Sequence, residues 1–197
     1  MIEKKKNRQQ SLIPVFIIAL VGCIIIFVAN RLTSDQIDLN KHATAIEMIE
    51  AVMPLTYDND LYNDRMDIAE LSTTVYRARF NADNVGLVFM PVSTMGYKDT
   101  IKMAIGLSYE GVIIGVRIIE QHETVDLGDN IDQLNSDWIN NFDNRSLDNT
   151  QDTAWAVTND DGEFDQLSGA TISPRNVINA VKNTLDFYEV NRDSLYN

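Results

Sequence analysis

The sequence predicts an α+β domain that follows a single N-terminal transmembrane helix. Residues 12–29 contain no charged side chain at all. After residue 40, helix-like apolar patterns flank a run of short β-branched and aliphatic segments. Helices that are segregated from an antiparallel meander are typical of the α+β class. A chain of 197 residues is long enough for one domain with its own core and one accessory segment.

The accessory segment is the apolar run from Leu12 to Ala29 (LIPVFIIALVGCIIIFVA). As a helix it spans roughly 27 Å, close to the hydrocarbon thickness of a bilayer. It has no polar face, which a soluble helix would need. Basic residues are concentrated before the run (Lys4, Lys5, Lys6 and Arg8), and only Arg31 and Lys41 follow it closely. The positive-inside rule therefore predicts a cytoplasmic tail at residues 1–11, a span in the inner membrane, and an exported remainder.

Two other fates of this run are open. A cleaved signal peptide is the simpler one, but the run is long for that role and no small-x-small cleavage pattern follows it. The segment Leu20-Val21-Gly22-Cys23 also resembles the box at which bacterial lipoproteins are cut and acylated. Against lipidation, the residues after Cys23 are strongly apolar. Because Cys23 is the only cysteine, intrachain disulfides and cysteine-ligated metal sites are excluded.

The exported part is strongly acidic. Four of the 16 Lys and Arg residues and one of the 29 Asp and Glu residues precede residue 30, which leaves 12 basic and 28 acidic residues, a balance of −16. This charge argues against nucleic acid and anionic lipid as partners. The carboxylates show no metal-ligand spacing and are interpreted as a solvated face.

The folded domain is expected over residues 41–197, after a polar linker at residues 30–40. Residues 42–53 carry apolar side chains at helical spacing, and Pro54 ends the predicted helix. Residues 58–67 are acidic without a clear period and are predicted to form a loop.

Four strands are predicted next, at residues 75–80, 85–92, 101–109 and 112–119. The last two are joined by Glu110-Gly111, which indicates a tight hairpin. Gly115 within the final strand indicates a bulge or a close backbone approach.

The C-terminal third is predicted to end in the strongest helix of the domain. Residues 137–142 are predicted to form a short helix and residues 153–158 a strand. Residues 173–188 then carry a helical apolar stripe, with Ser173 as the predicted N-cap and Pro174 in the first turn.

The most informative stretch is residues 165–174 (DQLSGATISP), just before that helix. Gly169 and Ala170 leave the backbone accessible to another molecule. A phosphate on the oxygen of Thr171 would lie near the free N–H groups and the positive dipole end of the helix. Arg175, one turn in, would add charge-assisted bonds. Taken alone, the stretch is also what a plain turn before a capped helix looks like, and such turns are common enough for physics alone to favour that interpretation.

The same stretch resembles the flavinylation motif Asp-x-x-Ser/Thr-Gly-Ala-Thr of FMN-binding domains. The match covers Asp165, Ser168, Gly169, Ala170 and Thr171. The resemblance implies that a dedicated flavin transferase cuts FAD and leaves FMN esterified through its phosphate to Thr171.

Nearly the whole chain is similar to the G subunit of the Rnf (Rsx) ion-translocating electron-transport complex. The segments that carry this resemblance are MGY at 95–97, GVRIIEQHET at 115–124, LGD at 127–129, SDW at 136–138 and FDQ at 164–166. They are specific in combination.

In that family, a Glu-Thr-Pro-Gly-Leu-Gly loop lies against the isoalloxazine ring. Its matching positions here are Glu123, Thr124, Leu127 and Gly128. Val125-Asp126 replaces Pro-Gly, and Lys98-Asp99 stands where the family's Gly-Tyr-Gly-Gly has its second glycine. A carboxylate at Asp126 that pointed to the ring would disfavour the anionic reduced flavin and lower its potential.

Four further side chains are interpreted without a chemical role. His122, at the end of a predicted strand, is expected to be a surface residue rather than an acid–base catalyst. Trp138, Tyr97 and Met95 are expected to anchor the core.

The resemblance implies an electron-carrier protein within a complex that couples electron flow between ferredoxin and NAD to the pumping of Na⁺ or H⁺. The chain has neither a dinucleotide-binding glycine turn nor an iron–sulfur cysteine set, so it needs other membrane and iron–sulfur subunits as partners. The alternatives are the C subunit of the Na⁺-pumping NADH:quinone reductase, a free-standing periplasmic flavoprotein, and a structural anchor without a cofactor.

Overall fold

A computed structural model describes residues 14–25, 27–28, 44–125 and 127–197 of the chain. They belong to two compact units, residues 1–44 and residues 45–197. In the first unit, residues 14–25 and 27–28 are helical, and their large apolar side chains are mostly exposed. The predicted span at 12–29 lies partly outside the described residues. Within the described ranges, no helix combines the length and the apolar character that crossing a bilayer requires.

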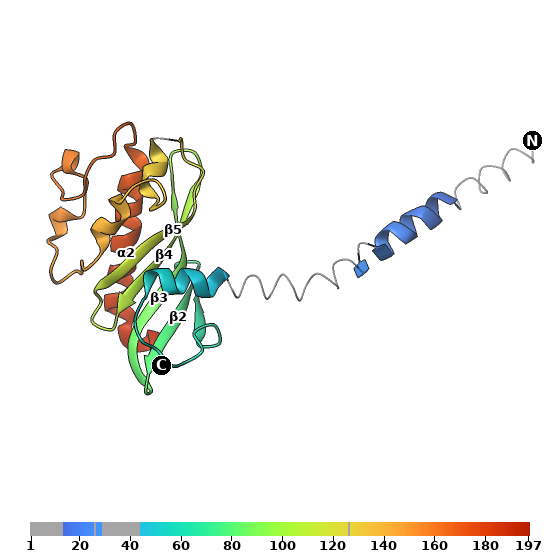
Figure 1. The fold of residues 1–197 in the computed structure, drawn as a ribbon, viewed down its shortest axis with the longest axis horizontal. Helices are drawn as coiled ribbons and strands as arrows, with labels where there is room; N and C mark the ends of the chain where they lie inside the picture. Colours follow the sequence, from blue (N-terminus) through green and yellow to red (C-terminus); the bar gives the residue numbers. More distant parts are fainter. Residues whose placement is uncertain (1–13, 26, 29–43, 126) are drawn as a thin grey trace, which may run out of the picture. The chain divides into compact units, whose positions relative to one another are not determined.

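The second unit is built on an antiparallel sheet whose strand order, β1-β2-β3-β4-β5, follows the chain (Figure 1). The strands are β1 (Arg65–Ile68), β2 (Thr73–Phe80), β3 (Asp83–Met95), β4 (Thr100–Ser108) and β5 (Ile113–Glu120). The four predicted strands correspond to β2–β5 and are confirmed. The first strand is a correction, because β1 begins inside the predicted loop at 58–67. Only four residues long and at the sheet edge, it is too short for its alternation to be read from the sequence.

Both faces of the sheet are covered. On one face, Val75, Phe89 and Ile105 belong to a core shared with α2 (Ile172–Leu195) and with the 3₁₀ helix η2 (Trp138–Phe142). On the other face, Val88 and Ala104 pack with the short helix at residues 44–52. Figure 1 shows this helix in cyan in front of the sheet and α2 in red behind it.

The helix at residues 44–52 confirms the prediction for residues 42–53 within the described residues, and it approaches the sheet at two glycines. A Cβ on Gly106 would lie 2.2 Å from the Val52 carbonyl oxygen, and one on Gly115 would lie 3.3 Å from it. Gly115 also sits beside a register shift in the β4–β5 pair. The predicted bulge or close approach at Gly115 is therefore confirmed in both senses. The predicted hairpin at Glu110-Gly111 is confirmed as well, since Gly111 has φ +81°.

Irregular segments differ more from the sequence prediction. The predicted strand at 153–158 is wrong: η3 (Asp152–Ala154) and η4 (Thr158–Asp160) lie there, and Val157 makes only an isolated bridge to Phe164. Its apolar side chains are buried in the core beside η2, and burial alone does not separate a strand from a compact turn. The short helix predicted at 137–142 is confirmed as η2.

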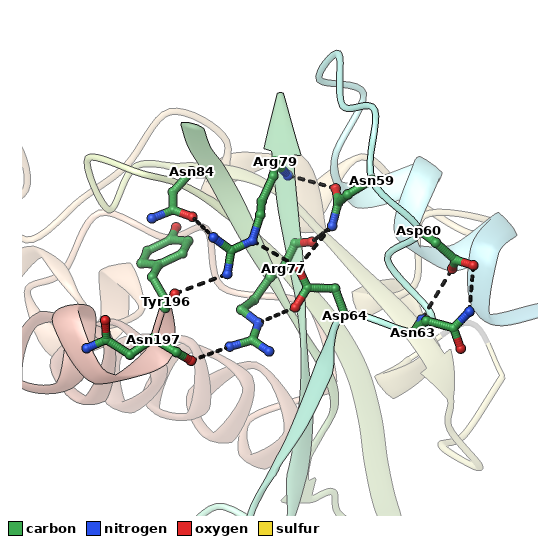
Figure 2. A network of polar contacts seen from close by, with 9 residues as sticks. All are labelled: Asn59, Asp60, Asn63, Asp64, Arg77, Arg79, Asn84, Tyr196 and Asn197. Carbon is green, nitrogen blue, oxygen red and sulfur yellow. Dashed lines mark hydrogen bonds and ion pairs between the residues drawn. The ribbon is translucent and has the colours of Figure 1, made fainter. Parts of the chain in front are cut away.

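The last helix is longer than predicted. α2 runs to Leu195, and its N-cap is Thr171 rather than Ser173. Beyond Tyr188, buried Leu195 continues the apolar stripe two turns later. Figure 2 shows how the end of α2 is held: Arg77 donates to the Asn197 carbonyl (2.7 Å) and Arg79 to the Tyr196 carbonyl (3.1 Å). Both arginines also pair with the carboxylate of Asp64.

Candidate functional site

Three segments enclose a cavity of about 440 Å³ at the start of α2. They are the turn that follows β3, the loop that follows β5, and the Ser-Gly-Ala-Thr segment that leads into α2. The lining residues are Tyr97, Glu123, Thr124, Leu127, Gly128, Gly169, Ala170, Thr171, Ile172 and Ser173. Seven of the nine predicted site residues are therefore together on the cavity wall; Ser168 and Arg175 are not among the lining residues.

The segment before α2 is fixed by contacts to its backbone. The indole N–H of Trp138 donates to the Asp165 carbonyl (2.8 Å), and the Gln166 side-chain amide donates to the Ala170 carbonyl (2.6 Å). Gly169 has φ +78°, and a Cβ there would lie 2.4 Å from Leu127 Cδ2. The positive φ favours glycine at this position, and a Cβ would also force the Leu127 side chain to move. Gly169 thus packs closely against Leu127, which brings the Ser-Gly-Ala-Thr segment into contact with the loop after β5.

Thr171 is exposed on the cavity wall and lies at the N-terminal end of α2, a 24-residue helix. It is the N-cap of α2, yet its side chain makes no capping hydrogen bond. The first N–H groups of a helix lack intrahelical partners, and its N-terminal end carries partial positive charge. The hydroxyl of Thr171 is thus placed where an attached anion would be stabilised.

Arg175 forms an ion pair with Asp160. Its guanidinium pairs with both oxygens of Asp160, at 2.5 Å (Nε–Oδ2) and 2.7 Å (Nη2–Oδ1). The hydrogen bond from Arg175 holds the pKa of the Asp160 carboxyl below its usual range. Arg175 Nη1 also reaches the backbone carbonyl of Thr171, at 3.5 Å. The predicted approach of Arg175 to a phosphate would have to compete with Asp160.

Glu123 is the buried charged group of the cavity, with an exposed fraction of 7%. Ser173 Oγ donates to its Oε2 (2.8 Å), and the Lys98 backbone N–H donates to its Oε1 (3.3 Å). Ser173 was predicted as a helix cap, and this is a correction: its side chain belongs to a long-range contact across 50 residues. Such a contact carries no local signal in the sequence.

The sequence of this chain is similar to known proteins, and the similarity includes the residues that line the cavity. Residues 96–186 match the FMN-binding domain family, and this range contains every residue of the cavity. The G subunit of the ion-translocating oxidoreductase complex of Pseudoalteromonas atlantica is 38% identical over 174 residues, which cover 83% of this chain and 80% of that protein. The G subunit from Photorhabdus laumondii is 36% identical and covers 80% and 78%.

The chain belongs to the G-subunit family of ion-translocating oxidoreductase complexes. This confirms the family identified from the sequence. A crystal structure of the C subunit of a Na⁺-translocating NADH-quinone reductase from Parabacteroides distasonis overlaps with a TM-score of 0.46 and 19% identity, over 68% of this chain and 70% of that one. That similarity is too low to carry an argument about function.

Tyr97 and Met95, which were expected to anchor the core, lie on the surface instead. Tyr97 is 70% exposed and lines the cavity, and Met95 is 63% exposed. Both follow the last buried positions of β3, where the strand runs past the core. Trp138 is buried, as predicted, and His122 is on the surface, as predicted, with its ring 4.0 Å from Asp99.

Three lining residues of the cavity were not among the predicted site residues: Tyr97, Ile172 and Ser173. For Tyr97 the sequence held a signal, since Met95-Gly96-Tyr97 is one of the segments that carry the family resemblance. Val125 is exposed and Asp126 lies outside the described residues, so the effect predicted for an Asp126 carboxylate stays a prediction. Within the described residues, no cluster of three or more His, Cys, Asp or Glu side chains is arranged to hold a metal ion.

Proposed function

We propose that this protein is the flavin-carrying electron-transfer subunit of an ion-translocating oxidoreductase complex, with FMN bonded through its phosphate to Thr171. FMN, when bound, accepts and releases electrons, and the protein supplies attachment, orientation and tuning of the potential. The observation that carries the proposal is the position of Thr171, an exposed residue that lines the cavity at the N-terminus of α2.

The residues around the cavity suit the parts of FMN. The helix N-terminus and the backbone of Gly169 and Ala170 favour a phosphate beside Thr171. Tyr97, Leu127 and Ile172 offer partly exposed apolar surface for a flat aromatic ring. A pocket lined by apolar groups with a few fixed polar ones is the usual form of a cofactor site.

Attachment is proposed to use FAD and a flavin transferase. The Thr171 oxygen forms a bond to the phosphorus that carries the riboflavin part of FAD. The bond from that phosphorus to the AMP part breaks, AMP leaves, and the threonine proton passes to solvent. The product is a phosphoester whose mass exceeds the polypeptide by FMN minus one water.

The membrane arrangement is part of the same proposal. Residues 12–29 anchor the chain in the inner membrane, residues 1–11 stay in the cytoplasm, and residues 41–197 carry the flavin on the outer side. Its partners are the other membrane and iron–sulfur subunits of an Rnf-type complex. The charge-free run and the basic residues that precede it support this orientation.

The decisive experiment concerns Thr171. Full-length protein produced together with a flavin transferase and exported should remain fluorescent in a denaturing gel, with the added mass on the peptide that contains Thr171. Thr171→Ala should remove the fluorescence because alanine has no oxygen to esterify, whereas Thr171→Ser should retain part of it. Arg175→Ala should keep the bond, since Arg175 already pairs with Asp160. Covalent flavin in Thr171→Ala would overturn the proposal.

The anchoring is tested separately. A reporter fused after Asn197 should be active outside the cytoplasm and silent inside it. Cys23→Ala should stay in the membrane with its N-terminus at or near Met1. A mature protein that begins at an acylated Cys23 would replace the transmembrane anchor with a lipid anchor.

A further inference from the structure

We infer that Glu123 is a positioning residue that holds the three walls of the cavity together and places a fixed negative charge beside the flavin, which lowers the flavin's midpoint potential. This inference rests on the proposed function. It assigns Glu123 a role that its place on the cavity wall alone does not give.

Glu123 connects the walls of the cavity. It belongs to the loop after β5. One of its carboxylate oxygens accepts from Ser173 in the first turn of α2, and the other accepts from the Lys98 backbone N–H in the turn after β3. One side chain thus bonds all three segments that enclose the cavity. Removing it would leave two donors without their acceptor, in a place where only 7% of Glu123 is exposed.

The carboxylate of Glu123 fits closely between two glycines. A Cβ on Gly96 would lie 2.0 Å from Glu123 Oε1, and a Cβ on Gly128 would lie 2.8 Å from Oε2. Two glycines, from two different walls, therefore leave the space that the carboxylate fills. The side chain is held from both sides and has little freedom to turn away from the cavity.

The contact with Ser173 also places the Glu123 carboxylate at the start of α2. Ser173 lies in the first turn of that helix, at the end that carries partial positive charge.

The consequence for the flavin is electrostatic. Glu123 lines the cavity and is buried, and water screens a charge poorly at such a position. A negative charge next to a group that gains electrons disfavours the gain, so it lowers the midpoint potential. The serine donor offsets part of this charge.

The first test needs no flavin. Hydrogen exchange would be measured on the full-length protein in detergent, produced without the flavin transferase. Glu123→Ala removes the carboxylate, so the acceptor of both original bonds is lost, whereas a Gln amide could still bond Lys98 N–H and the Ser173 hydroxyl. Exchange in peptides covering residues 96–99 and 123–128 should become about tenfold faster, while β3 and β4 exchange as in the wild type. Unchanged exchange in both peptides would overturn the positioning role.

The second test separates charge from structure. The midpoint potential of the flavin-loaded protein would be measured for the wild type, Glu123→Gln and Ser173→Ala. Glu123→Gln should shift the potential in the positive direction because the charge is gone. Ser173→Ala loses one bond of the same network but keeps a less compensated carboxylate, so its potential should stay or move in the negative direction. Positive shifts in both variants, or none in Glu123→Gln, would overturn the electrostatic role.

Failure of the inference is distinguishable from failure of the proposed function. If the wild type carries no covalent flavin, the proposed function is wrong, and the exchange experiment still decides whether Glu123 joins the three walls. If the flavin is present, exchange does not respond to Glu123→Ala and the potential does not respond to Glu123→Gln, the proposed function stands and the inference is wrong.

Discussion

Substitution of Gly169 by alanine probes the turn that presents Thr171. Gly169 has φ +78°, a left-handed conformation that costs about 1–2 kcal/mol for a residue with a Cβ. The new methyl group would also lie 2.4 Å from Leu127 Cδ2. Leu127 is 39% exposed and can rotate away, at a cost of roughly 0.5–1.5 kcal/mol. Together these two costs should lower the unfolding free energy by about 2–3 kcal/mol.

The assay is thermal or urea unfolding, followed by the fluorescence of the two buried tryptophans. In a folded unit of about 150 residues, this loss lowers the melting temperature by roughly 5–10 °C. Ser168→Ala is the matched control, because Ser168 is exposed in the same turn and has no positive φ. It should change stability by less than about 0.5 kcal/mol.

A double variant separates the two costs. Adding Leu127→Ala to Gly169→Ala removes the side chain that the new methyl group would meet, so only the conformational cost should remain. The coupling energy should be roughly 0.5–1.5 kcal/mol. If Gly169→Ala unfolds like the wild type, the turn does not have the left-handed conformation, and the account of how Thr171 is presented is refuted.

Three other substitutions test the scaffold around the site. Asp64→Asn weakens the pairing with two partly buried arginines and should lower the unfolding free energy in urea by about 2 kcal/mol. The control Asp83→Asn, at an exposed position, should leave the unfolding free energy almost unchanged. Equal losses of unfolding free energy in both variants would mean that only the net charge matters. Gly106→Ala forces a Cβ to 2.2 Å from a backbone oxygen of the helix at 44–52, so limited proteolysis should cut that helix more readily; an unchanged cleavage pattern would contradict the close approach. Trp138→Phe removes the hydrogen bond to the Asp165 carbonyl but keeps an aromatic ring in the core, and should cost about 1 kcal/mol in urea unfolding; a gain in stability would contradict this contact.

Elements governed by local pattern were predictable from the sequence. The strands β2–β5 alternate or run apolar over eight or more residues, and the β4–β5 turn carries a glycine where φ is positive, at Gly111. The short edge strand β1 and the compact turns near Trp155 were not predictable in this way. Their structure depends on packing against distant segments, which periodicity does not record.

The candidate site was predictable for a different reason. Its residues on two segments, the loop after β5 and the segment before α2, were identified from family resemblance. The structure brings these two segments to one cavity. The bonds of Ser173 and Lys98 to Glu123 were not predictable, because they join residues 50 and 25 positions apart. A serine just before a proline was interpreted from its local context as a helix cap, whereas the tertiary contact decided its role.

The charges around Thr171 give a physical reason for the proposed covalent link. A phosphate held without a bond needs cations, and Arg175, the cation closest in sequence, already pairs with Asp160. Residues 30–197 carry a balance of −16, which disfavours a free phosphate dianion at the surface. The helix N-terminus alone supplies only a modest stabilisation. A phosphoester to Thr171 removes one negative charge from the phosphate and retains the cofactor without relying on affinity. In the proposed function, the covalent bond therefore compensates for the weak binding of a free phosphate at this site.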